Sequence, residues 1–313
     1  MFARDSYDAR RASTDQVRVP PRLEYHLHMS SALPNPAPSN PAPSNPASLN
    51  CARRTALITG ASHRVGRAIS LELAGAGFDL VLTYRSRADE CGETARLAME
   101  AGQAAGFAIS ASTHALDLSD TKAAEEFARA RAAVCGTAGG GGGGTATAID
   151  VLVHNASEYR ANTFGATSAG DLEVAHRVEV VSPFLMTQAL REPLSRSMLS
   201  GGASVIFFSD TYALGRARAG FTPYMVAKAA VETLARQLAV ELAPKVRVHC
   251  IAPGVILWPD DFPSAAKDAI LARTPLARTG TAEDAARLVR FLALEASFAT
   301  GETIRIDGGR ALR

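Results

Sequence analysis

The chain has 313 residues, of which 47% are hydrophobic, and its 33 lysines and arginines nearly balance 31 aspartates and glutamates. A net charge of +2 gives no long-range attraction to nucleic acid or to an anionic membrane, so we expect neither as a partner. No stretch approaches the roughly 18 apolar residues that a membrane-spanning helix needs. These values permit one α/β domain with a full core, whose partners are recognised by shape and local chemistry.

The first fifty residues differ in composition from the rest. Residues 35–39 and 40–44 form a direct repeat rich in Pro, Asn and Ser, which predicts a disordered tail over residues 1–50. Residues 1–24 mix arginines with acids and lack an apolar centre, so they do not form a secretory signal. We therefore expect a cytoplasmic protein, with organellar targeting by the arginine-containing tail as the alternative.

The cysteines and the glycines suggest no metal site and no second phosphate loop. Cys51, Cys91, Cys135 and Cys250 are widely spaced, without a C-x-x-C motif, which predicts reduced thiols and no bound metal. Gly139–Gly144 is a run of six glycines that no Lys-Ser/Thr pair follows, so we interpret residues 136–147 as a flexible surface insertion.

From Thr55 onward, short apolar runs alternate with segments of helical period. The expected strands are Ala56–Thr59, Leu80–Tyr84, Ala108–Leu116, Asp150–His154, Ser204–Ser209, Val246–Ala252 and Thr303–Ile306. The expected helices are Val65–Leu73, Ala88–Ala101, Thr121–Val134, Leu172–Met198, Tyr224–Leu242 and Ala282–Leu294. This alternation predicts a seven-stranded parallel sheet, doubly wound, with helices on both faces, in one α/β domain over residues 51–313.

Two motifs carry the chemistry. Gly60 lies in a turn between the first strand and the first helix, and Gly66 lies at the start of that helix, where backbone N–H groups and the helix dipole can hold a pyrophosphate. Tyr224 and Lys228 are four residues apart and therefore share one face of a helix.

The order of these motifs along the chain resembles the classical short-chain dehydrogenases/reductases from about Thr55 to Arg313. The remaining members of the set are Asp117-Leu118, Asn155-Ala156, Pro253-Gly254 and Asp307-Gly308-Gly309. Within that superfamily the chain is most similar to the pteridine reductases, including the dihydromonapterin reductase type. That similarity rests on Arg64, Tyr84-Arg85-Ser86, Asn155-Ala156-Ser157, Asp210 and Ile256-Leu257-Trp258-Pro259.

The resemblance implies a Rossmann-like fold and assigns catalytic roles to four residues. Tyr224 is the expected proton donor, and Lys228 would lower the pKa of its phenol by about three units, while also holding the nicotinamide ribose. Asp210 stands where the superfamily usually has Ser, and it could relay a proton toward a ring nitrogen. The alternatives are that Asp210 only caps a turn and that Ser209 takes the usual Ser role.

The end of the second strand predicts NADPH as the cofactor. Arg85 and Ser86 can hold a 2′-phosphate, and no acid occurs there until Asp89. His63 is expected to add to that site. The full set of expected cofactor contacts is Gly60, His63, Arg64, Val65, Gly66, Tyr84, Arg85, Ser86, Asp117, Leu118, Asn155, Ala156, Ser157, Lys228, Pro253, Gly254 and Ile256.

The expected substrate contacts follow from the similarity to pteridine reductases. Tyr159 would stack on the pterin ring, and Arg64 would approach both the pterin and the cofactor phosphates. Trp258 is either part of a substrate lid or a packed hydrophobic anchor. The full set of expected substrate contacts is Arg64, Ser157, Tyr159, Asp210, Tyr224 and Trp258.

Three residues depart from the superfamily pattern. Glu179 stands where an Asn usually completes a proton relay, and His154 and His249 each replace another Asn. Because the change at Glu179 introduces a charge, we expect slower turnover or an altered proton route.

The sequence therefore predicts an NADPH-dependent reductase that takes a dihydropterin to its tetrahydro form. The alternatives are a carbonyl reductase acting on a 3-oxoacyl, sugar or xenobiotic ketone, and an NADP(H)-binding pseudoenzyme or sensor. By analogy with the superfamily, the helices Leu172–Met198 and Tyr224–Leu242 would form the contacts of a homotetramer.

Overall fold

A computed structural model describes residues 53–136, 148–213, 215–258 and 262–313. The predicted tail at residues 1–50 and the glycine run Gly139–Gly144 lie outside the described residues. Within the described part of the chain, no helix combines the length and the apolar character needed to cross a membrane.

A seven-stranded sheet, parallel throughout, forms the centre of the domain, with the strand order β3-β2-β1-β4-β5-β6-β7. Its strands are β1 Arg54–Ile58, β2 Phe78–Tyr84, β3 Ala111–Ala115, β4 Val151–His154, β5 Ala203–Phe208, β6 Val246–Pro253 and β7 Thr303–Ile306. The central strands read as continuous apolar runs because both faces of a parallel sheet are covered by helices. This architecture confirms the predicted doubly wound α/β fold.

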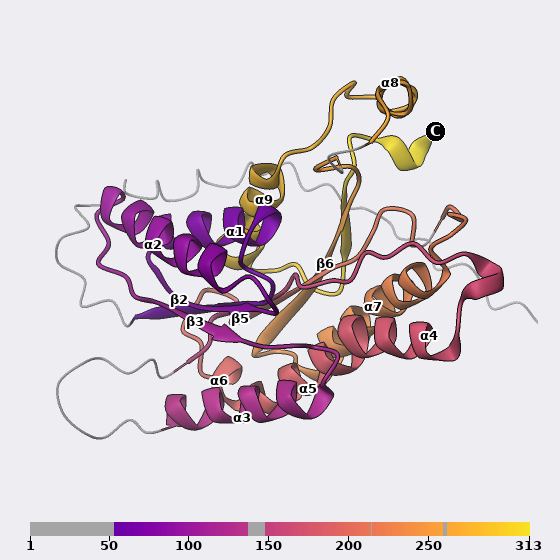
Figure 1. Cartoon of the computed structure of the whole chain (residues 1–313). Coiled ribbons are helices and arrows are strands. Elements are labelled where there is room, and N and C mark those ends of the chain that lie inside the picture. Colours follow the sequence, from indigo (N-terminus) through magenta and orange to yellow (C-terminus); the bar gives the residue numbers. More distant parts are fainter. Residues whose placement is uncertain (1–52, 137–147, 214, 259–261) are drawn as a thin grey trace, which may run out of the picture. The chain divides into compact units, whose positions relative to one another are not determined.

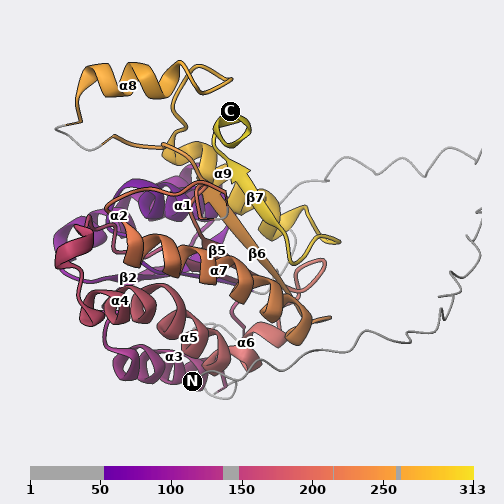
Figure 2. The same cartoon turned by 90° about the vertical axis from the view of Figure 1, so that its right-hand side faces the viewer.

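Helices cover both faces of the sheet (Figures 1 and 2). On one face lie α1 Arg64–Gly75, α2 Ala88–Ala104 and α9 Ala282–Leu294. On the other face lie α3 Thr121–Gly136, α4 Ala169–His176, α5 Ser182–Ala189, α6 Arg191–Ser195 and α7 Thr222–Glu241. The short helix α8 Ser264–Leu271 lies beside the C-terminal turn Arg310–Leu312, and an Arg310 Nη1 donor 2.8 Å from the Ile270 carbonyl oxygen links them.

Side chains that alternate along each strand divide the core into two halves. Ile58 packs with Ile69 and Val289 on the α1/α9 face, whereas its neighbour Leu57 packs with Met186 and other residues on the α5/α7 face. Successive strand residues point to opposite faces, so one strand supplies both halves of the core. The sheet is therefore packed between two apolar layers. Polar side chains that contact a ligand are expected where the strands end.

Two predicted elements differ from the structure. The expected helix Leu172–Met198 is divided into α4, a wide π turn over Arg177–Val181, α5 and α6. Pro183 lies in the first turn of α5, and Pro193 lies within α6, where a missing backbone N–H is tolerated. The strand expected at Ala108–Leu116 is shorter, because only Ala111–Ala115 pairs with β2 at this edge of the sheet.

Helix α8 was not predicted from the sequence. None of its eight residues is buried, so it contributes no side chain to the core.

The order of the strands reverses between β1 and β4. The chain moves outward from β1 through β2 to β3 and then crosses back to β4 on the other side of β1. A crevice forms at the carboxyl ends of the strands at such a point, and ligands of open α/β sheets bind there.

Candidate active site

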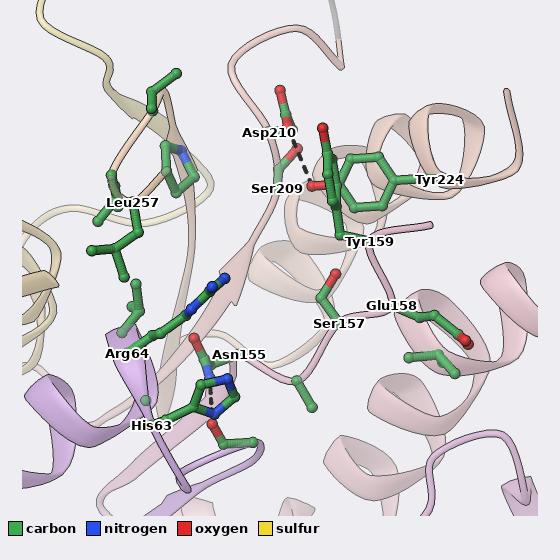
Figure 3. Close-up of a pocket in the computed structure, with 18 of the residues that line it drawn as sticks. His63, Arg64, Asn155, Ser157, Glu158, Tyr159, Ser209, Asp210, Tyr224 and Leu257 are labelled. Atoms are coloured by element: carbon green, nitrogen blue, oxygen red, sulfur yellow. Dashed lines mark hydrogen bonds between the residues drawn. The ribbon is translucent and has the colours of Figure 1, made fainter. Parts of the chain in front are cut away.

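A cavity of about 790 Å³ opens at this crevice. Every predicted site residue except Lys228 lines it, although they come from loops as far apart in sequence as Gly60 and Trp258. Figure 3 shows His63, Arg64 and Asn155 at one end and Asp210, Tyr224 and Tyr159 at the other. The cavity therefore has two ends with different chemistry.

The turn after β1 is packed too tightly for larger side chains. Gly60 has a φ of +67°, and a Cβ there would lie 2.8 Å from Cα of Ala156. A Cβ on Gly66 would overlap the carbonyl oxygen of Gly60. The side-chain amide of Asn155 donates to the carbonyl oxygens of Thr59 (3.0 Å) and Gly60 (2.9 Å), so it fixes the turn against β4.

The N-terminus of α1 is open to an anion. His63 precedes the helix without capping it through its side chain, and the first turn contains no acid. Its first backbone N–H groups are therefore available, and the buried Nδ1 of His63 has no partner among the described residues. Burial, followed by the charge of Arg87, lowers the pKa of His63, so the ring is neutral near pH 7.

Arg64 begins α1 with a left-handed φ of +52°. This region costs a non-glycine residue about 1 kcal/mol. The guanidinium extends into the cavity between the two ends (Figure 3).

The exposed rim after β2 carries positive charge. Arg85, Ser86 and Arg87 all line the cavity, and the one ion pair of Arg85 among the described residues is a long 3.9 Å contact with Glu158. Arginine and hydroxyl donors suit a phosphate. These residues, the open helix N-terminus and the glycine turn together fit a phosphorylated dinucleotide, which would supply a hydride when bound.

At the other end of the cavity, Tyr224 and Asp210 form a hydrogen-bonded pair. The Tyr224 hydroxyl donates to Oδ2 of Asp210 at 3.2 Å, and the backbone N–H of Tyr212 donates to Oδ1 of the same carboxylate at 2.9 Å. Asp210 thus forms both contacts considered from sequence: it caps the following turn and contacts the phenol.

Lys228 lies behind Tyr224, with its Nζ 5.6 Å from the centre of the phenol ring. It donates to the Phe208 carbonyl oxygen at 2.7 Å and forms an ion pair of 2.7 Å with Glu179. Oε1 of Glu179 also accepts from the Ser157 hydroxyl at 2.5 Å. The residue that departs from the superfamily pattern is therefore the direct partner of Lys228.

This ion pair changes the electrostatics of the phenol. Burial raises the pKa of Tyr224 well above 10, and the negative charges of Asp210 and Glu179 raise it further. The prediction that Lys228 lowers this pKa is wrong for this arrangement, because Glu179 compensates the lysine charge. The phenol stays protonated, which suits a proton donor.

Ser209 and His154 have structural partners, whereas the ring nitrogens of His249 have no hydrogen-bond partner among the described residues. The Ser209 hydroxyl lies 2.9 Å from Oε1 of the buried Glu232, and no hydrogen bond joins it to Tyr224 in the described part of the chain. His154 stacks on Phe207 and contacts Thr187, and burial lowers the pKa of its ring to about 3. His249 is fully buried, and its pKa is lowered to about 4, chiefly by burial.

Aromatic rings form the walls beside Tyr224. Tyr159 is half-exposed, stacks on Phe221 at 4.8 Å between ring centres and meets the edge of Tyr224 at 5.1 Å. Trp258 packs on Phe262 at 4.9 Å, and both line the cavity. A flat substrate ring fits between such walls.

Sequence reasoning missed four polar residues of this end, because Tyr212, Arg216, Arg218 and Arg310 all line the cavity. Arg310 follows β7 and donates to the Tyr212 hydroxyl. The other three lie in the irregular segment between β5 and α7, where no periodicity indicates which side chains point inward. Two arginines just before the Tyr224 motif were the available signal.

Comparisons with known proteins agree with this geometry. A protein-family profile described as enoyl-(acyl carrier protein) reductase matches residues 60–311. An uncharacterized oxidoreductase of Mycobacterium tuberculosis is 36% identical over 262 residues, covering 82% of this chain and 91% of its own. A 3-oxoacyl-[acyl-carrier-protein] reductase of Aggregatibacter actinomycetemcomitans is 32% identical over 260 residues, covering 82% of this chain and 98% of its own.

Solved structures share the fold. A blue fluorescent protein from a metagenomic library, in complex with NADPH, superposes with a TM-score of 0.68 at 28% identity and covers 82% of this chain and 98% of its own. Because the profile and the relatives span the glycine turn, Tyr224 and Lys228, the chain belongs to the short-chain dehydrogenase/reductase family of oxidoreductases.

Proposed function

We propose that this oxidoreductase uses NADPH to reduce a dihydropterin to its tetrahydro form. The observation that carries the proposal is the Asp210 carboxylate, 3.2 Å from the Tyr224 hydroxyl, beside a cavity walled by aromatic rings. A carboxyl group there can serve a substrate that is protonated on a ring nitrogen.

The proton route follows from these contacts. As the substrate accepts a hydride, the O–H bond of Tyr224 breaks and an N–H bond forms on the substrate ring. The resulting phenolate recovers a proton through Asp210, which lines the cavity and is only partly buried. The ion pair between Lys228 and Glu179 fixes these two side chains behind Tyr224.

The preference for NADPH over NADH rests on Arg85 and Ser86, the phosphate-binding side chains at the end of β2. The NADPH-bound fluorescent protein is consistent with this preference. The ratio of kcat/KM for the two cofactors tests it. We expect Arg85→Asp to reverse the ratio, and an unchanged ratio would contradict the assignment.

The decisive experiment is the loss of NADPH absorbance with dihydrobiopterin or dihydromonapterin, alongside a panel of ketones. We expect turnover of the dihydropterin by the parent and none by Tyr224→Phe. Turnover of ketones alone would refute the proposal, and tight NADPH binding without any turnover would favour a sensor.

The second candidate is reduction of a 3-oxoacyl thioester or another ketone. It is supported by the relative named as a 3-oxoacyl-[acyl-carrier-protein] reductase. Tyr224 could protonate a carbonyl oxygen as readily as a ring nitrogen, so the same substrate panel distinguishes the two.

We further propose a homotetramer assembled through α4 and α7. A groove of about 410 Å³ lies between them, and its lining residue Val226 is 58% exposed. Exposed apolar surface of this kind favours a protein contact. Light scattering should give four copies for the parent and fewer for Val226→Glu, and a monomeric parent would refute the assembly.

A further inference from the structure

Positive charge in the cavity is distributed over both of its ends. Arg64, Arg85 and Arg87 come from the loops after β1 and β2, where the proposed cofactor phosphates bind. Arg216 and Arg218 come instead from the segment between β5 and α7, which also supplies Asp210 and precedes Tyr224 in the first turn of α7. Arg310, from the C-terminal turn, lines the cavity too and donates to the Tyr212 hydroxyl. Arg216 and Arg218 therefore belong to the end where the substrate is reduced.

The acids that line the cavity are engaged elsewhere. Glu158 contacts Arg85 at 3.9 Å, Asp210 accepts from Tyr224 and Tyr212, and Asp117 accepts from the backbone N–H of Ser119 at 2.9 Å. Within the described ranges, no acidic side chain forms an ion pair with Arg216 or Arg218. Their charge is thus left for a ligand to compensate.

Aromatic contacts hold Arg218 beside the reacting centre. Its guanidinium carbon lies 4.3 Å from the ring centre of Phe221 and 5.4 Å from that of Tyr159. Tyr159 in turn contacts the edge of Tyr224 at 5.1 Å. Stacking occupies the face of a guanidinium and leaves the N–H donors on its edge free to bind an anion.

We infer that the substrate carries an anionic group, a carboxylate or a phosphate, on the side chain attached to its reducible ring, and that Arg216 and Arg218 bind this group. The inference rests on the proposed reductase function. One aromatic ring separates Arg218 from Tyr224, so the anion lies a short side chain away from the atom that is protonated. Neutral pterins would fill the aromatic slot without engaging the arginines.

Binding to the NADP⁺-loaded chain tests this directly, because no turnover is needed. Calorimetry would compare dihydroneopterin, which is neutral, with its phosphate ester and with dihydrofolate, which bears carboxylates. We expect the parent to bind an anionic ligand about tenfold more tightly than dihydroneopterin. The phosphate ester and dihydrofolate arms show which anion the site prefers.

The variant is Arg216→Gln combined with Arg218→Gln, and the control is Arg191→Gln, an exposed arginine at the start of α6. The double variant should lose about tenfold in affinity for the anionic ligand and less than about twofold for dihydroneopterin. Added salt should weaken only the anionic complex of the parent and of the control. Equal affinities in the parent, or equal losses in the double variant, would overturn the inference.

Measurements of turnover distinguish failure of the anion site from failure of the proposed pterin reaction. If no dihydropterin is reduced, the pterin reaction fails, and the same variants are titrated with 4-oxopentanoate, a short anionic ketone, and with its neutral ethyl ester. A tenfold loss of affinity confined to 4-oxopentanoate retains the anion site on a ketone reductase. Failure of every anionic ligand to bind more tightly than its neutral partner overturns it on either substrate class.

Discussion

Nζ of Lys228 lies 2.7 Å from Oε2 of Glu179, and both side chains are 3% exposed. A lysine in a buried ion pair contributes little net positive potential to its surroundings, because the carboxylate compensates it at close range. The phenol of Tyr224 is therefore next to a neutral pair and near the negative Asp210 rather than next to a free cation. The following predictions concern this arrangement and the cofactor end of the cavity.

Replacing Glu179 should shift the pH dependence of turnover. A proton donor works while it is protonated, so activity is lost as the pH rises through the pKa of Tyr224, which lies well above 10 in the parent. Glu179→Gln removes one negative charge that raises this pKa, so the alkaline loss of kcat moves to lower pH. The parent should keep a constant kcat up to about pH 10, so an alkaline loss of kcat that enters the range of about pH 6 to 10 in Glu179→Gln reports the shift.

The same variant should be less stable, because Lys228 keeps its buried charge without a carboxylate. We expect a loss of about 3 kcal/mol in the free energy of unfolding, measured with urea. Glu302→Gln removes an exposed carboxylate just before β7 and serves as the control, with no effect on either measurement. An unchanged pH profile in Glu179→Gln would show that this carboxylate does not act on the phenol.

Asp210 should distinguish pterin from ketone chemistry. Asp210→Ser restores the residue usual in the superfamily and removes the carboxyl group that contacts Tyr224. We expect dihydropterin turnover to fall about 100-fold, while any ketone turnover stays within a few-fold. Steady-state kcat values on both substrate classes measure this, and parallel losses would argue that Asp210 only shapes the loop.

Arg64 should lower the stability of the parent protein while strengthening its binding of NADPH. Its φ of +52° is relaxed by Arg64→Gly but not by Arg64→Ala, so only the glycine variant should gain up to about 1 kcal/mol in unfolding free energy. Both variants lose the guanidinium and should bind NADPH more weakly, as measured by fluorescence titration. Equal stability of the two variants would contradict the strain argument.

Gly66 should be intolerant of a side chain. A Cβ there would overlap the Gly60 carbonyl oxygen and lie 2.9 Å from Nδ2 of Asn155, so Gly66→Ala should cost about 1–3 kcal/mol and weaken NADPH binding more than tenfold. Gly75, at the end of the same helix, has open space around its Cβ position. Gly75→Ala should leave binding unchanged and stability equal or higher. A tolerated Gly66→Ala would mean that the turn can relax.

The strands and most helices could be predicted because apolar periodicity reports burial directly. Leu57 and Ile58 face opposite halves of the core, which gives β1 its continuous apolar run. Periodicity failed for Leu172–Met198, because a wide turn changes the phase of a helix without interrupting its apolar content. It also missed α8, which buries none of its residues.

The site could be predicted as a set of residues but not as a set of contacts. From the order of the motifs along the chain, Gly60, Asn155 and Tyr224 were predicted to share one site, and all three line the cavity. The net charge near the Tyr224 hydroxyl depends on which acid pairs with Lys228. That acid, Glu179, is 49 residues away in the sequence, on another helical segment. Pairing at that separation is a property of the folded chain.

The wide turn over Arg177–Val181 determines which way Glu179 points. Consecutive residues of a regular helix are rotated by about 100° about its axis, so deleting one residue from this turn would direct position 179 away from Lys228. The length of the turn thus sets the direction of the Glu179 side chain about the helix axis. A single-residue change in helix length there would release Lys228 and the Ser157 hydroxyl together, because Glu179 holds both.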